Sequence, residues 1–151
     1  MKLTDLDKNS RLWLYQANRA LNDTEIVWMN ERLESFAKEW AAHGNQLKAA
    51  GEVLNPYFVA LAVDTEAVNA SGCSIDSSVR FIKQAGQELG IDFFNRLKLV
   101  VEDESGDIEY VSYARLGENP DFMVFNPLVD RVGDLAAEFK ITAEKFLALS
   151  R

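Results

Sequence analysis

The stretch from Ala70 to Ser78 combines residue types that could bind a ligand or act as a nucleophile. It reads Ala-Ser-Gly-Cys-Ser-Ile-Asp-Ser-Ser and holds the only cysteine of the chain, Cys73. It follows a strand-like run that ends at Asp64 and opens an amphipathic helical pattern near Ile75. Free amides and hydroxyls at a helix start can bind an anion or favour a thiolate. The same residue types cap helices, so the stretch predicts where a site lies and leaves its activity open.

Cys73 and His43 are the candidate catalytic pair. If the only histidine of the chain lay within hydrogen-bond reach of the thiol, the two would form a nucleophile and its base. The alternative interpretation treats Cys73 as a small buried apolar residue where the chain enters the helix. Lone cysteines are mostly packing residues, which favours the second interpretation.

Small and polar residues around this helix start are candidates for ligand binding. Serine hydroxyls and backbone amides could hold a phosphate or a carboxylate, although no Lys or Arg occurs between Lys48 and Arg80. Two carboxylates near a strand end could bind Mg²⁺ with waters, but the sequence names no third ligand. We therefore expect neither a metal nor a cofactor. The candidates here are Ser71, Gly72, Ser74, Asp76 and Asp64.

A second candidate site lies at the polar end of the first predicted strand. Arg19 could hold a carboxylate or phosphate, with Asn18 and Gln16 orienting it. In the alternative interpretation these residues form a strand end and a turn with ordinary backbone hydrogen bonds. Both interpretations stay open at this point.

The elements that must position these residues follow from hydrophobic periodicity and capping signals. Asn22 precedes Glu25 by three positions, which predicts a capping box at the start of a long amphipathic helix. Gly44 is expected to end that helix, with His43 in its last turn. Gly90 is expected to end the second helix. The predicted strands are 11–16, 46–54, 57–63, 96–101, 108–113 and a short strand or apolar loop at 121–125; the predicted helices are 22–44, 75–89, a stretch ending near 139, and 142–150.

This order predicts an α+β fold in one domain, residues 1–151. A βαββαββ run is typical of a two-layer sandwich in which two main helices cover an antiparallel or mixed sheet, ferredoxin-like or related. Helices at the C-terminal end are expected to add to it.

Composition narrows the classes of partner. The 151 residues are 48% hydrophobic and 26% charged, as in ordinary soluble domains. The net charge of -8, with Lys and Arg scattered, argues against nucleic acid and against anionic membrane. One cysteine, no signal-peptide pattern and no apolar run of roughly 20 residues favour a cytoplasmic location. The expected partner is an unidentified small molecule or protein, with a homo-oligomer as a further option.

Several catalytic motifs are absent from the sequence. It contains no G-x-x-x-x-G-K-[ST] loop, no G-x-G-x-x-G after a strand and no G-x-S-x-G elbow. One histidine and one cysteine cannot build a tetrahedral zinc site within the chain. These absences argue against an ATPase and favour a protein that binds without catalysis.

Four stretches carry a family resemblance: 10–16 with Asn18-Arg19, then 40–44, 71–79 and 124–126. In combination they resemble a family of small bacterial proteins of unknown function that often carry an automatic "ABC transporter ATPase" label. The resemblance covers most of the chain and implies no mechanism. The residues do not support the label, because the Walker A motif and the Leu-Ser-Gly-Gly-Gln signature are both missing.

The sequence thus predicts a non-enzymatic binding or interaction module with a small polar pocket near the helix start at residue 75. The alternative is a thiol-dependent enzyme that uses Cys73, with His43 as base, on a small anionic substrate.

Overall fold

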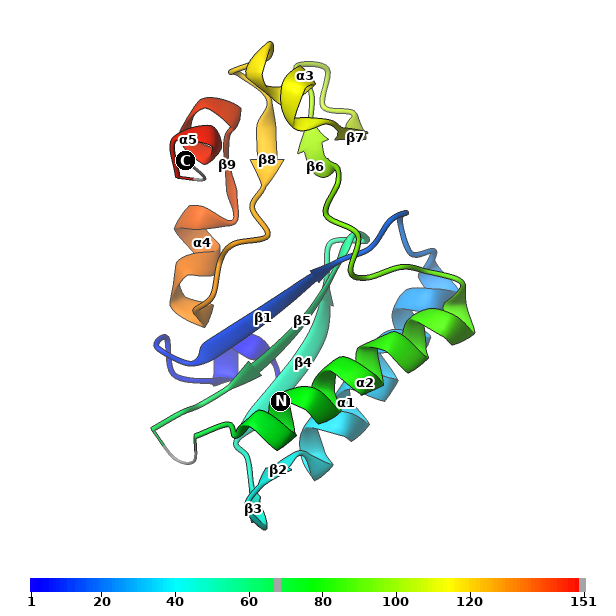
Figure 1. Ribbon diagram of the computed structural model, residues 1–151, viewed down its shortest axis with the longest axis vertical. Helices are drawn as coiled ribbons and strands as arrows, with labels where there is room; N and C mark the ends of the chain where they lie inside the picture. The colour runs from blue at the N-terminus through cyan, green and yellow to red at the C-terminus, as the bar shows by residue number, and fades with distance from the viewer. Residues whose placement is uncertain (67–68, 150–151) are drawn as a thin grey trace.

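The structure is a computed structural model that describes residues 1–66 and 69–149. They form two main antiparallel sheets, with helices packed against them (Figure 1). In chain order the elements are η1 (Leu3–Asp5), β1 (Arg11–Gln16), α1 (Asp23–Glu39), β2 (Ala41–Ala42), β3 (Asn45–Gln46), β4 (Ala49–Leu54), β5 (Phe58–Val63), α2 (Gly72–Leu89), β6 (Leu99–Glu102), β7 (Ile108–Val111), α3 (Tyr113–Gly117), β8 (Met123–Phe125), η2 (Val132–Asp134), α4 (Leu135–Glu138), β9 (Lys140–Thr142) and α5 (Ala143–Leu149).

The first sheet has the order β1-β5-β4, and every residue of its central strand β5 is buried. Successive side chains of a strand point to opposite faces, so β5 contributes to two cores. Val59, Leu61 and Val63 belong to the core under the long helices. Phe58, Ala60 and Ala62 belong to the core on the other face.

The helices α1 and α2 lie side by side on one face of this sheet (Figure 1). Asn22 caps α1 as predicted, since its side chain accepts from Glu25 N while the Glu25 side chain accepts from Asn22 N. Phe36 of α1 stacks on Phe81 of α2 with ring centroids 4.5 Å apart. Gly90 ends α2 in the left-handed conformation with φ 67°, also as predicted.

The second sheet has the order β7-β6-β8-β9 and lies beyond the opposite face of the first (Figure 1). Its strand β6 alternates like β5: Leu99 and Val101 pack under α3 and α5, with Leu116 and Phe146. Val100 instead joins the core shared with the first sheet. Apolar burial therefore connects the two sheets through β6.

The α+β sandwich with two main helices is confirmed, and its strands divide between sheets. The strands predicted at 96–101 and 108–113 pair with each other as β6 and β7. Strand β6 also pairs with β8, so both belong to the second sheet and do not extend the first. Observed β6 begins at Leu99, three residues later than the predicted 96–101 strand. The predicted strand 46–54 is also divided, because β3 ends at Gln46 and β4 begins at Ala49.

The prediction that Gly44 ends the first helix is wrong. Helix α1 ends at Glu39, and Trp40 already has extended dihedrals. His43 and Gly44 have φ values of 51° and 79° and form the turn between β2 and β3. Two left-handed residues in succession are what a two-residue hairpin turn requires, so a glycine that resembled a helix stop serves a hairpin instead.

Candidate functional site

The serines at the start of α2 hydrogen-bond to the helix itself. Ser71 is the N-cap: its Oγ accepts from Ser74 N at 3.2 Å. Ser74 Oγ accepts from Ser71 N at 2.7 Å and donates to Ser71 O at 2.8 Å. Ser78 Oγ donates to Ile75 O at 2.6 Å. The helix begins at Gly72 rather than Ile75, so these three hydroxyls satisfy backbone groups of its first turns.

Cys73, Gly72 and Asp76 are exposed at this helix start. The interpretation of Cys73 as a buried packing residue is therefore wrong: it stands on the solvent side of the first turn while Ser74 faces inward. His43 is also exposed, in the β2–β3 turn. In the described part of the chain, no hydrogen bond joins Cys73 to His43, so their placement lends no support to a nucleophile and base pair.

Asp64 closes the turn that follows β5. Its buried carboxylate accepts from Glu66 N at 3.0 Å and lies 3.7 Å from the Lys48 ammonium. Asp76 stands in the second turn of α2 because the helix begins earlier than expected. Residues 1–66 and 69–149 contain no group of three potential ligands that could hold a metal ion.

The Arg19 guanidinium already binds an internal carboxylate. It donates to both oxygens of Glu25, at 2.9 and 2.8 Å, and to Leu89 O at the end of α2, at 2.9 Å. The hydrogen bonds from Arg19 and Asn22 N lower the pKa of Glu25 to about 2. Arg19 thus ties the start of α1 to the end of α2, and an external anion would have to displace Glu25.

Asn18 and Gln16 border a pocket at the end of β1. Asn18 exchanges two hydrogen bonds with Asp92: its N donates to Asp92 O at 3.0 Å and its Oδ1 accepts from Asp92 N at 2.9 Å. Gln16 is 2% exposed, and its Nε2 donates to Lys98 O at 2.8 Å. Gln16 Oε1 is buried and has no hydrogen-bond partner.

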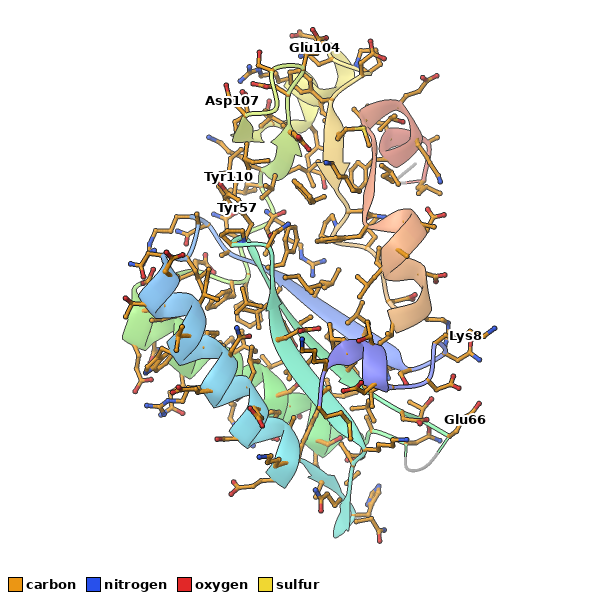
Figure 2. All side chains as sticks on the ribbon, turned by 180° about the vertical axis from the view of Figure 1, so that it is seen from behind. Lys8, Tyr57, Glu66, Glu104, Asp107 and Tyr110 are labelled. Atoms are coloured by element: carbon orange, nitrogen blue, oxygen red, sulfur yellow. The ribbon has the colours of Figure 1, made fainter. Side chains whose placement is uncertain are left out.

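This pocket, which we call the junction pocket, has a volume of about 320 Å³ and lies where β1 meets the loop before β6 and strand β7. Tyr57 and Tyr110 mark the same junction (Figure 2), with ring centroids 5.9 Å apart. Burial is the main cause that raises the pKa of Tyr110, and the neighbouring Tyr57 raises it further. The Tyr110 hydroxyl donates to Ala17 O at 2.6 Å. The lining residues are Gln16, Asn18, Asn95, Leu97, Lys98 and Tyr110.

The junction pocket offers a ligand both a hydrogen-bond acceptor and several donors. Gln16 Oε1 is an acceptor. Asn18 and Asn95 each use Oδ1 to accept a backbone N–H, which leaves their Nδ2 groups as donors. Lys98 adds a cation that has no ion pair within the described residues. Leu97 is 80% exposed and gives the rim an apolar edge.

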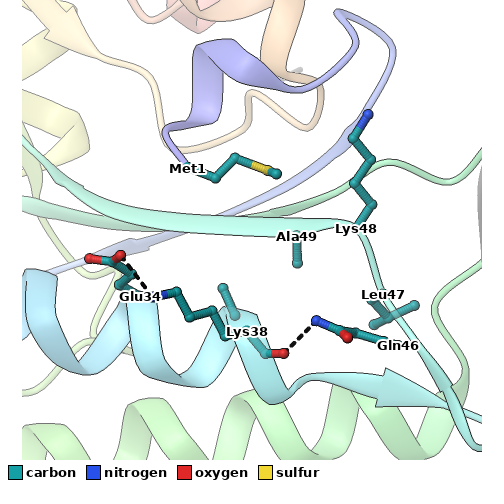
Figure 3. Close-up of a pocket in the computed structure, with 8 residues that line it drawn as sticks. Met1, Glu34, Lys38, Gln46, Leu47, Lys48 and Ala49 are labelled. Atoms are coloured by element: carbon teal, nitrogen blue, oxygen red, sulfur yellow. Dashed lines mark hydrogen bonds and ion pairs between the residues drawn. The ribbon is translucent and has the colours of Figure 1, made fainter.

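A larger pocket of about 420 Å³ lies between α1 and the β3–β4 segment (Figure 3). Several of its polar side chains already have partners in the protein. Glu34 pairs with Lys38 at 3.2 Å, and Gln46 Nε2 donates to Lys38 O at 2.6 Å. Lys48 faces Asp64. No buried side-chain atom without a partner lies among its described lining residues, so it offers less to a polar ligand than the junction pocket does.

The sequence placed Gln16 and Asn18 together but missed the rest of the junction pocket. Asn95, Leu97, Lys98 and Tyr110 lie more than 70 positions further along the chain. Nothing in their local pattern marks them, because they reach β1 through the packing of the second sheet.

Comparison with known proteins adds no relative. No family model matches the chain, and neither a curated protein nor a solved structure matches it. The resemblance to the bacterial family stays a prediction. Across residues 1–66 and 69–149, no helix combines the length and apolarity required to cross a membrane.

Proposed function

We propose that the protein is a non-enzymatic binding module that holds a small polar molecule in the junction pocket. The observation that carries the proposal is Gln16 Oε1, a buried acceptor without a partner. Leaving such a group unpaired costs about 1–3 kcal/mol. A ligand N–H or O–H that reaches this oxygen would recover much of that cost.

The orientation of the Gln16 amide supports this assignment. Its Nε2 donates to Lys98 O at 2.8 Å. Rotating the amide would oppose two oxygens, so the acceptor side is the one left free. The ligand must therefore supply a donor at this position.

The other lining groups suggest the remaining chemistry of the ligand. The Nδ2 groups of Asn18 and Asn95 and the Lys98 ammonium are donors, and Lys98 favours a negative group. A small carboxylate that also carries an N–H or O–H fits this set. This proposal keeps the predicted binding module but moves its pocket from the start of α2 to the end of β1, since the serine hydroxyls at α2 are engaged in capping.

The test is a screen of small amino and hydroxy carboxylates by ¹H–¹⁵N NMR. Binding is expected to shift the side-chain amide signals of Gln16, Asn18 and Asn95 together. Gln16→Met keeps the length of the side chain but has no amide, and should abolish the shifts of Asn18 and Asn95. Gln84→Met, on the exposed side of α2, should not. A single ordered water on Gln16 Oε1 in a high-resolution crystal structure, with no compound shifting these signals, would contradict the proposal.

A further inference from the structure

A second cleft lies at the opposite end of β1. It has a volume of about 400 Å³ and is built from the start of β1, the segment after β5 and the segment before η2. We call it the arginine cleft. Its lining residues are Arg11, Leu12, Trp13, Thr65, Asn69, Asp130 and Arg131.

Arg11 and Arg131 are directly opposite each other in this cleft. They form an isolated antiparallel bridge. The flanking bonds run from Leu12 N to Asp130 O at 2.9 Å and from Val132 N to Ser10 O at 3.1 Å. The two arginines are therefore a non-hydrogen-bonded pair, the kind whose side chains start closest together. Like charges placed directly opposite each other destabilise a sheet.

Both guanidinium groups contact neutral groups. The Arg11 guanidinium lies over the Trp13 ring, 4.6 Å from its centroid, and Arg131 donates to Asn9 O at 3.1 Å. Among the described residues, neither arginine is in an ion pair, although Arg19 and Arg115 both are. Asp130 also lines the cleft but forms no ion pair with either arginine in the described chain. The cleft thus carries a local excess of positive charge in a chain with 24 acidic and 16 basic residues.

We infer that the arginine cleft binds a phosphate group between Arg11 and Arg131. Guanidinium forks donate paired hydrogen bonds to oxyanions, and a bound dianion would turn a repulsive pair into two attractive contacts. Thr65 and Asn69 stand beside the arginines and supply further polar groups. This inference is independent of the junction pocket, because the two lie at opposite ends of β1 and share no lining residue.

The test titrates the full chain with inorganic phosphate while NaCl holds the ionic strength constant. The indole N–H signal of Trp13 should shift saturably, and the midpoint of thermal unfolding should rise above that in chloride alone. Arg11→Gln and Arg131→Gln should each weaken apparent phosphate affinity roughly tenfold. Without phosphate and at low salt, both variants should be at least as stable as the wild type, because the repulsion is gone.

The matched control is Arg32→Gln. Arg32 also lies over an indole, that of Trp28, at 4.7 Å, so this variant removes the same charge and the same kind of contact from a different place. It should keep the full phosphate response. Arg11→Lys keeps the charge but loses the fork, and should fold like the wild type with weakened phosphate binding. A parallel titration with methyl phosphate distinguishes two kinds of ligand. If methyl phosphate binds as well as inorganic phosphate, the ligand is a phosphate monoester; if it binds more weakly, the ligand is free phosphate.

Two results would overturn the inference. One is an equal response to chloride and phosphate at matched ionic strength. The other is an equal loss in Arg32→Gln and Arg11→Gln, which would mean that the response follows net charge. Neither result bears on the junction pocket, whose reporters are Gln16, Asn18 and Asn95.

Discussion

The Arg19 guanidinium and the Glu25 carboxylate are joined by two hydrogen bonds, and this pair fastens α1 to the end of α2. The ion pair lies near the surface, where isolated pairs contribute little on average. Here both partners have further structural bonds: Glu25 also accepts from Asn22 N at 3.0 Å. The pair therefore acts as part of a helix cap rather than as a free surface contact.

Glu25 should make the stability of the protein depend on acid pH. Its folded pKa of about 2 lies below the ordinary value of 4.5. The stabilising effect is therefore complete above about pH 4.5 and is lost as the pH falls toward 2. Urea unfolding between pH 7 and 2 should show a weaker decline below pH 4.5 in Glu25→Gln than in the wild type. Glu31→Gln, an exposed carboxylate of α1, should leave the decline unchanged.

Trp40 joins the end of α1 to the first turn of α2. Its Nε1 donates to Ser74 O at 2.8 Å, and the residue is 3% exposed. Trp40→Phe keeps an aromatic ring but loses this hydrogen bond. Ser74 lies within α2, so its carbonyl still accepts a helical bond, and we expect a loss of about 0.5–1.5 kcal/mol in the free energy of unfolding. Trp28→Phe, at a half-buried position on α1, should cost clearly less in the same denaturant titration. Equal losses would mean that the hydrogen bond contributes nothing.

Substitution by alanine should have opposite effects on stability at two glycines of α2. A Cβ at Gly86 would lie 2.5 Å from Ile91 O, a backbone atom that cannot rotate away. Gly86→Ala should therefore destabilise the protein by about 1–3 kcal/mol. A Cβ at Gly72 meets nothing within 4 Å, and Gly72→Ala should be neutral or stabilise by about 0.5–1 kcal/mol. Thermal unfolding of both variants checks the pair.

The thiol of Cys73 should react with a neutral alkylating reagent without unfolding. The residue is exposed, so labelling under native conditions should proceed at a rate close to that in denaturant. His43→Gln should leave the native rate unchanged, because no hydrogen bond joins the two residues within the described chain. A marked slowing in that variant would revive the thiol-dependent enzyme as an alternative.

Local signals were enough to predict much of the first sheet and its helices. Strand 11–16 and the Asn22–Glu25 capping box depend on residues close together in sequence, and both are confirmed. The helix end predicted at Gly44 was wrong because a left-handed glycine suits a helix end and a hairpin turn equally well. Whether 99–102 pairs with β5 or with β8 depends on contacts distant in sequence, which no local pattern encodes.

The same limit applies to the candidate sites. Gln16 and Asn18 could be singled out because they end a recognisable strand. Arg19 could be singled out too, but its internal partner Glu25 was assigned only to the cap. The opposition of Arg11 and Arg131 arises from a pairing across 120 positions, so the sequence alone did not reveal it.

The burial of β5 determines which amide protons report global unfolding. This strand is hydrogen-bonded on both edges, to β1 and β4, and covered on both faces. Its amide protons can exchange only when β1 or β4 separates from it, and both neighbours are held by the same two cores. Exchange with deuterium should therefore be slowest in residues 58–63 and report global unfolding there. The protons of the β2–β3 hairpin, a two-stranded ribbon outside both main sheets, should exchange first.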